Sequence, residues 1–108
     1  MSYTSIYASA EPARSEVEGL AGASVIEFGA PWCGHCIAAQ PPLEAALARH
    51  PDVRHLKIED GRGRPLGRSF RIKLWPTLVL LRDGEELARV VRPMQTEDIQ
   101  QLLARIDR

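Results

Sequence analysis

The chain lacks most of the features that would set it apart from small globular proteins. Its 108 residues include only two cysteines, which excludes a framework of several disulfides. No stretch approaches the roughly 18 apolar residues that a membrane-spanning helix needs. Fourteen basic and fourteen acidic residues balance, so no overall charge attracts nucleic acid or an anionic membrane. These absences predict one domain, residues 1–108, that binds neither nucleic acid nor membrane, and we expect a monomer.

One local excess of charge interrupts this balance. Between Gly61 and Trp75 the chain has no acidic residue and five basic ones, namely Arg62, Arg64, Arg68, Arg71 and Lys73. Two interpretations stay open, a solvated helix face and a docking surface for acidic partners.

The first residues do not show the pattern of an export signal, which is a basic start followed by an apolar run. We therefore expect a cytoplasmic protein. In a reducing compartment, an isolated pair of cysteines is more often catalytic or metal-binding than structural.

The two cysteines stand two residues apart in the segment Cys33-Gly34-His35-Cys36. The segment 23–28 before them is typical of a buried strand, and the residues from Cys33 to about His50 are typical of a helix. Cys33 would then lie at a helix N-terminus, where free backbone N–H groups favour a thiolate. We expect Cys33 to be exposed and to attack a substrate disulfide. Cys36, one turn further along and more buried, would resolve the mixed disulfide.

At these residues the chain resembles the thioredoxin superfamily. The stretch Val25–Cys36 is similar to the family's active-site stretch, and its inner pair Gly34-His35 is closer to protein disulfide isomerase domains than to ordinary thioredoxin. Trp75-Pro76-Thr77 is similar to the family's cis-proline turn, and Asp83-Gly84-Glu85 to its turn between strands. The resemblance implies a thiol–disulfide oxidoreductase that needs no bound cofactor.

The periodicity along the chain agrees with this fold. It predicts strands over 24–28, 53–59, 77–81 and 86–91 and helices over 12–20, 33–50, 65–70 and 96–106. Pro41-Pro42 should bend or interrupt the second helix, and a weak first strand could lie near 3–7. We expect an α/β thioredoxin fold, with a central mixed sheet of four to five strands flanked by about four helices.

The resemblance also implies roles for polar residues near the dithiol. Glu27 matches a buried acid that shuttles protons to and from the second cysteine, and burial would raise its pKa. Lys57 matches the lysine beside that acid. His35 would favour the thiolate and move the reduction potential from about −270 mV, the thioredoxin value, toward the −180 mV of protein disulfide isomerase. His50 and His55 are expected at the surface.

The resemblance implies that Trp75, Pro76 and Thr77 form the substrate platform, where a cis bond before Pro76 would expose the backbone of Trp75 to an extended substrate. Trp75 stands where the family usually has an aliphatic residue. It could anchor apolar substrate side chains or cover Cys36, and both alternatives stay open.

Three further residues are expected on the substrate surface. Trp32 and Gly34 flank the cysteines. Arg92 stands where the family usually has a glycine, which would alter the surface that docks substrates and the reductase. The expected partners are protein disulfides, with a thioredoxin reductase or glutathione as electron donor.

The sequence is compatible with two other classes of function. Cys33, His35 and Cys36 could ligate a metal, but structural zinc needs four ligands and the chain offers no second such cluster. A thioredoxin fold could also act as a binding module that docks to a protein client and has secondary redox activity.

Overall fold

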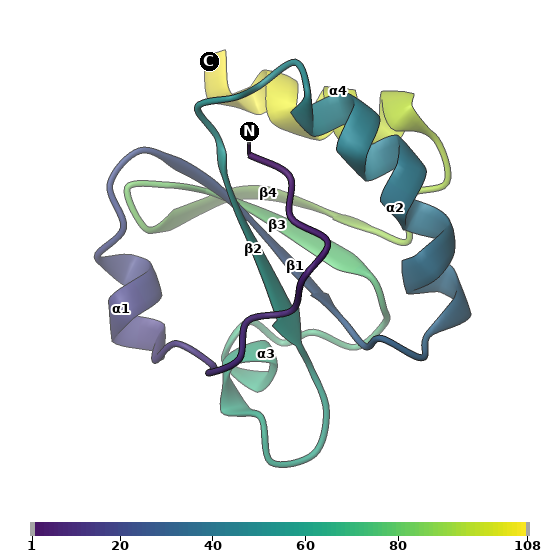
Figure 1. The fold of residues 1–108 in the computed structure, drawn as a ribbon. Coiled ribbons are helices and arrows are strands. Elements are labelled where there is room, and N and C mark those ends of the chain that lie inside the picture. Colours follow the sequence, from purple (N-terminus) through teal and green to yellow (C-terminus); the bar gives the residue numbers. More distant parts are fainter. Residues whose placement is uncertain (1, 108) are drawn as a thin grey trace.

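The computed structural model describes residues 2–107 and has a four-stranded mixed sheet at its centre (Figure 1). The strands are β1 (Ala23–Gly29), β2 (Arg54–Glu59), β3 (Thr77–Arg82) and β4 (Glu85–Val91), in the spatial order β2-β1-β3-β4. β1 and β2 are parallel, whereas β3 is antiparallel to both β1 and β4. The expected mixed sheet is confirmed.

Four α-helices cover the sheet: α1 (Arg14–Glu18), α2 (Gly34–Leu47), α3 (Pro65–Ser69) and α4 (Thr96–Leu103). A short 3-10 helix (Ala104–Asp107) follows α4. Figure 1 shows α2 and α4 on one face of the sheet and α1 and α3 on the other. This is the predicted thioredoxin architecture. None of the helices in residues 2–107 is long and apolar enough to cross a membrane.

Two local predictions are corrected. Pro41 and Pro42 lie inside a continuous α2, so they do not interrupt it, while the alternative of a bend stays a prediction. Each proline leaves a carbonyl one turn back without its N–H partner, and these carbonyls belong to Ile37 and Ala38, which are solvent-exposed and can be hydrated. The weak first strand is not formed. The segment 3–7 leads instead into a backbone hydrogen bond from Ala8 N to the Lys57 carbonyl of β2, at 2.8 Å.

The core has two halves because successive side chains of a strand point to opposite faces. Beneath α2 and α4, residues of β1 and β3 pack with helix residues: Val25, Leu78, Leu80, Leu43, Leu47, Ile99 and Leu103. On the other face the cluster comprises Val17, Ile26, Phe28, Ile58, Leu66, Phe70, Val79 and Leu81. Glu27 of β1 therefore lies on the α2 face, between apolar neighbours in the sequence that point the other way.

β2 follows the same alternation. Val53 joins the cluster under α2, and His55 and Lys57 extend from the same face of the strand. The parallel register pairs Val25 with His55 and Glu27 with Lys57. Two basic side chains of β2 are thus brought beside the one acid of β1.

Candidate active site around the dithiol

The dithiol is positioned by the junction of β1 and α2. Cys33 is the N-cap residue of α2, with extended backbone angles (φ −82°, ψ 120°). Its Sγ accepts a hydrogen bond from the backbone N of Cys36 at 3.3 Å. The sulfur of Cys33 therefore lies at the positive end of the helix, where a negative charge is stabilised.

The two free thiols differ in accessibility. Cys36 is 1% exposed and Cys33 is 8% exposed, so the predicted order is confirmed, but the expectation of an exposed Cys33 is wrong because both thiols are buried. Trp75 contributes to the burial of the dithiol, because it packs against the cluster of Ala30, Cys33 and Cys36. The exposed part of Cys33 opens into a groove of about 370 Å³, which is lined by Trp32, Cys33, Gly34, His35, Lys73, Leu74, Trp75 and Arg92.

Cys36 is held as a protonated thiol. Burial, its hydrogen bond with Cys33 and the charges of Cys33 and Glu27 raise the pKa of Cys36 to about 12. The sulfur also packs closely on the end of β1, since a Cβ atom on Gly29 would lie 2.6 Å from Cys36 Sγ. A base is therefore needed before Cys36 can act as a nucleophile.

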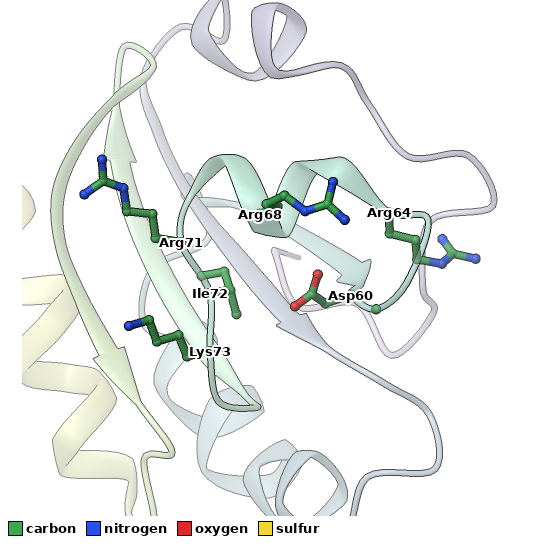
Figure 2. A pocket seen from close by; sticks show the side chains of 7 residues that line it. Asp60, Arg64, Arg68, Arg71, Ile72 and Lys73 are labelled. Carbon is green, nitrogen blue, oxygen red and sulfur yellow. The ribbon is translucent and has the colours of Figure 1, made fainter.

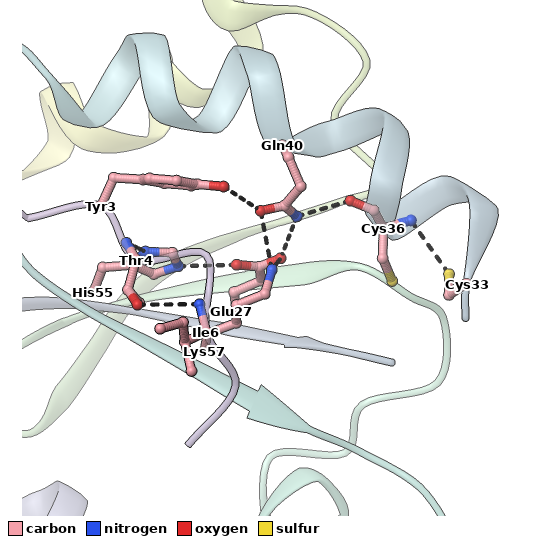
Figure 3. Close-up of polar contacts among 9 residues, drawn as sticks. All are labelled: Tyr3, Thr4, Ile6, Glu27, Cys33, Cys36, Gln40, His55 and Lys57. Atoms are coloured by element: carbon pink, nitrogen blue, oxygen red, sulfur yellow. Dashed lines mark hydrogen bonds and ion pairs between the residues drawn. The ribbon is translucent and has the colours of Figure 1, made fainter. Parts of the chain in front are cut away.

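Glu27 is completely buried and its carboxylate is fully hydrogen-bonded (Figure 3). His55 Nε2 lies 2.9 Å from Oε1, while Lys57 Nζ and Gln40 Nε2 donate to Oε2 at 2.9 and 2.7 Å. Burial alone would raise the pKa of Glu27, but these hydrogen bonds and the Lys57 charge outweigh it and lower the pKa. The expectation of a raised pKa is wrong, and Glu27 is an ionised carboxylate at neutral pH.

Lys57 is the predicted neighbour of the acid, and its contact with Glu27 is confirmed. Its ammonium also donates to Gln40 Oε1 at 2.9 Å and lies 4.6 Å from the centre of the Tyr7 ring. The side chain is 4% exposed. Its charge is therefore shared by groups within the site and is little screened by water.

The sequence interpretation missed His55, which was expected at the surface. It is buried because the alternation of β2 points it under α2 and the N-terminal segment covers it. The backbone N of Thr4 donates to His55 Nδ1 at 3.0 Å, and the Tyr3 ring stacks on the imidazole with ring centres 5.5 Å apart. The sequence feature that could have indicated this burial is the alternation of β2, which places His55 on the same face as Lys57, two residues later.

Gln40 was also missed, and it joins the acid to the second cysteine. Its Nε2 donates to the Cys36 carbonyl at 2.8 Å as well as to Glu27. Its Oε1 accepts from Tyr3 Oη at 2.8 Å and from Lys57. The sequence feature that could have indicated Gln40 is its position as a polar residue one helical turn after Cys36. Beside this amide, a cavity of about 230 Å³ is lined by Tyr3, Ser5, Tyr7, Ala30, Pro31, Cys36, Ile37, Gln40 and Lys57.

The turn before β3 forms one wall of the groove. The Trp75–Pro76 peptide bond is cis. Trp75 Nε1 donates to Asp60 Oδ2 at 2.9 Å, and its ring meets Trp32 edge-on with centres 5.5 Å apart. Thr77 is 2% exposed and its hydroxyl donates to the Leu74 carbonyl at 2.7 Å. The Thr77 side chain therefore lies beneath the turn, which corrects its assignment to the substrate surface.

Arg92 closes over the same turn. Its φ of 50° is in the left-handed region, which explains why a glycine suits this position. Arg92 Nε donates to the Trp75 carbonyl and its backbone N to the Pro76 carbonyl, both at 2.8 Å. The Trp75 carbonyl, expected to be free for a substrate strand, is occupied by this guanidinium.

The basic stretch lines a separate hollow of about 420 Å³ around Asp60, Gly61, Arg64, Arg68, Arg71, Ile72 and Lys73. Figure 2 shows Arg64 and Arg71 pointing to opposite sides of this hollow. The positive charges of these side chains do not converge on one point. This is the arrangement expected of side chains that are simply solvated. Within residues 2–107, no group of three histidine, cysteine or acidic residues is placed to hold a metal ion.

A four-stranded mixed sheet with a dithiol at the start of α2 and a buried acid beneath it defines a thioredoxin-fold dithiol protein. The family model "Thioredoxin" matches residues 6–105. The chain therefore belongs to the thioredoxin family, a class of protein-disulfide oxidoreductases.

Individual relatives agree with this assignment. The solved structure of reduced thioredoxin 2 from Pseudomonas aeruginosa is 52% identical and superposes with a TM-score of 0.84, covering 94% of each chain. Thioredoxin of Chlamydia trachomatis is 35% identical over 78% of this chain and 82% of its own. Thioredoxin H2-1 of rice is 39% identical over 62% of this chain, and the match spans only about half of the rice protein (49%).

Proposed function

We propose that this protein reduces or exchanges the disulfides of other proteins through Cys33 and Cys36. The observation that carries the proposal is the contrast between the two thiols. Cys33 lies at a helix N-terminus and opens into a groove, whereas Cys36 is a buried thiol whose pKa is raised by burial and in part by the charge of the ionised Glu27. An accessible attacking thiol and a protected resolving thiol are what a two-step exchange requires.

In the first step, the Cys33 thiolate attacks one sulfur of a substrate disulfide. The substrate S–S bond breaks, a Cys33–substrate disulfide forms, and the second substrate sulfur leaves as a thiolate that takes up a proton. The helix N-terminus stabilises the attacking thiolate. Trp32, Gly34 and Trp75 line the groove in which the substrate chain would lie.

In the second step, Cys36 passes its proton to the Glu27 carboxylate and attacks Cys33 Sγ. The mixed disulfide breaks, the Cys33–Cys36 disulfide forms, and the substrate sulfur leaves and is protonated. Two electrons have then moved from the protein to its substrate. The cavity of about 230 Å³ is lined by Cys36 and by Lys57 and Gln40, which both donate to Glu27, and we propose that water in it carries the proton toward the carboxylate.

The direction of exchange depends on the reduction potential. His35 is exposed beside the dithiol, and we propose that it shifts the couple toward the oxidising end of the family. Glutathione or a thioredoxin reductase would return the electrons. The guanidinium of Arg92 on the Trp75 carbonyl changes the surface that such partners meet. A cytoplasmic location and a monomeric state stay predictions.

Turnover of insulin disulfides with a small dithiol as electron source tests the proposal. Cys33→Ser should abolish turnover, while Cys36→Ser should accumulate a mixed disulfide with substrate that mass spectrometry detects. Thermal unfolding of both variants serves as the control for folding. Turnover by Cys33→Ser, or a covalent adduct on Cys36 in that variant, would contradict the assigned order of attack.

A binding module is the second candidate. Trp32 is 73% exposed and Leu74 is 48% exposed, and both line the groove, so apolar surface is available there for docking. A binding module predicts that a client captured by the wild type is also retained by the variant with both cysteines changed to serine. Disulfide exchange through Cys33 and Cys36 predicts that this variant no longer captures the client.

A further inference from the structure

His55 is fixed through both of its ring nitrogens. Nδ1 accepts the backbone N–H of Thr4, so that nitrogen carries no hydrogen, and the ring hydrogen lies on Nε2. Nε2 therefore donates to Glu27 Oε1 at 2.9 Å (Figure 3). The Tyr3 ring stacks on one face of the imidazole, with ring centres 5.5 Å apart.

This contact divides the carboxylate of Glu27 between two sets of donors. Oε1 is taken by His55, while Oε2 is taken by Lys57 and Gln40. Gln40 also holds the Cys36 carbonyl, and Figure 3 shows Glu27 between His55 on one side and Cys36 on the other. Fixing Oε1 thus fixes the whole carboxylate relative to the start of α2.

The ionisable groups around this carboxylate come from three elements. Lys57 extends from β2, Cys36 from α2, and Tyr3 and Tyr7 from the N-terminal segment. Burial and the Glu27 charge raise the pKa of both tyrosines, so they are neutral hydroxyls when the acid titrates. The two tyrosines therefore add no charge of their own beside the carboxylate.

We propose that His55, locked by the backbone of Thr4, is a positioning residue that keeps Glu27 oriented and ionised as the base for Cys36. The inference rests on the proposed function. It makes the N-terminal segment part of the redox site, because that segment supplies the N–H that sets which nitrogen of His55 donates. His55 does not touch the reacting sulfurs, and its effect reaches them through Glu27.

The step to measure is release of the second substrate thiol, which needs an ionised Glu27, as a function of pH in single turnovers. His55→Leu removes the donor, so the acid limb of this profile should move up by about one pH unit. His55→Gln can place an amide N–H near the position of Nε2 and should restore part of the shift. His50→Gln, at a histidine outside the network, is the matched control and should leave the acid limb unchanged.

The backbone lock is tested separately. Thr4→Pro removes the N–H that donates to Nδ1 and should move the acid limb in the same direction by a smaller amount. Thr4→Ala keeps that N–H and should keep the limb at its wild-type pH. If His55→Leu does not fold, the comparison of Thr4→Pro with Thr4→Ala tests the proposal in its place. A shift in Thr4→Pro alone supports the proposal, and matching profiles for the two variants overturn it.

Titration of the Glu27 carboxyl carbon by NMR gives a readout that does not depend on activity. The pKa of Glu27 should rise in His55→Leu by about the shift of the acid limb. An unchanged carboxyl titration in folded His55→Leu would overturn the inference while leaving the disulfide chemistry intact. A wild type that never releases the second thiol would instead overturn the proposed function, and the carboxyl titration would still test His55.

Discussion

Replacing Gly29 with alanine would place a methyl group where the sulfur of Cys36 now lies. The added Cβ would be 2.6 Å from Cys36 Sγ and 3.5 Å from both Cys36 Cβ and Tyr7 Oη. Nonbonded atoms of this size normally stay about 3.5–4.0 Å apart, so the sulfur or the strand must move by about 1 Å. Gly29 and Cys36 are both buried, so the displacement has to be taken up by buried neighbours or by movement toward the cavity of about 230 Å³ that Cys36 lines.

Overpacking of this kind typically costs about 1–3 kcal/mol. For a domain of this size we expect a Tm lower by about 4 °C or more. The free energy of unfolding of the reduced protein in urea gives the direct measurement. Because the displaced atom is the resolving sulfur, release of the second substrate thiol should also be slower in Gly29→Ala.

Gly34→Ala is the matched control. Gly34 is the first residue of α2, and a Cβ there would meet nothing within 4 Å. Alanine at that helical position should be neutral or stabilise the protein by up to about 1 kcal/mol. If Gly29→Ala were as stable as the wild type within about 0.5 kcal/mol, the close packing of Cys36 against β1 would be refuted.

Three further predictions concern the potential, the groove and the buried acid. His35→Pro should lower the reduction potential toward the thioredoxin value by about 30 mV or more, and an unchanged equilibrium with glutathione would remove the tuning role. Arg92→Gly frees the Trp75 carbonyl and suits the φ of 50°, so KM for a peptide disulfide should fall at unchanged kcat. A higher KM would show that the guanidinium aids binding. Folding lowers the pKa of Glu27, so its stabilisation is present above its ordinary pKa of about 4.3 and is lost as the pH falls. The free energy of unfolding of Glu27→Gln should therefore fall less steeply than that of the wild type in acid, and equal slopes would contradict this.

The local parts of the site could be predicted from the sequence. An apolar strand followed at once by the two cysteines places Cys33 at the start of a helix, because the strand end and the helix start are neighbours along the chain. The pairing of Lys57 with Glu27 was also predicted, through the resemblance that matches Lys57 to the lysine beside the family's buried acid, and the strand register places them opposite each other. These features depend on local sequence or on the register of adjacent parallel strands.

The rest depends on contacts that the sequence pattern does not specify. The alternation of β2 placed His55 on the same face as Lys57, but a histidine on an edge strand is usually exposed. The N-terminal segment, which covers it through Thr4 and Tyr3, completes its burial. The predicted direction of the Glu27 pKa shift was also wrong because of contacts that the sequence pattern does not specify. Burial of the carboxyl was predicted, but its hydrogen-bond donors were not.

For Arg92, the sequence predicted the position of an altered surface but not the contact that the side chain makes. The resemblance indicated that a glycine is usual at this position, and the positive φ gives the physical reason. The side chain's contact with the Trp75 carbonyl could not be foreseen, because it depends on how the loop after β4 folds over the cis-proline turn. Sequence reasoning therefore located the altered surface without predicting what the arginine does there.

The reduction potential of the Cys33–Cys36 pair, measured by equilibration with glutathione while the thiolate absorbance is followed, tests the central claim most directly. The account predicts a single two-electron equilibrium between about −270 and −180 mV, nearer the second value. A potential at or below about −270 mV would contradict the role of His35. Formation of only a mixed disulfide with glutathione, with no bond between the two cysteines, would contradict the assignment of Cys36 as the resolving thiol.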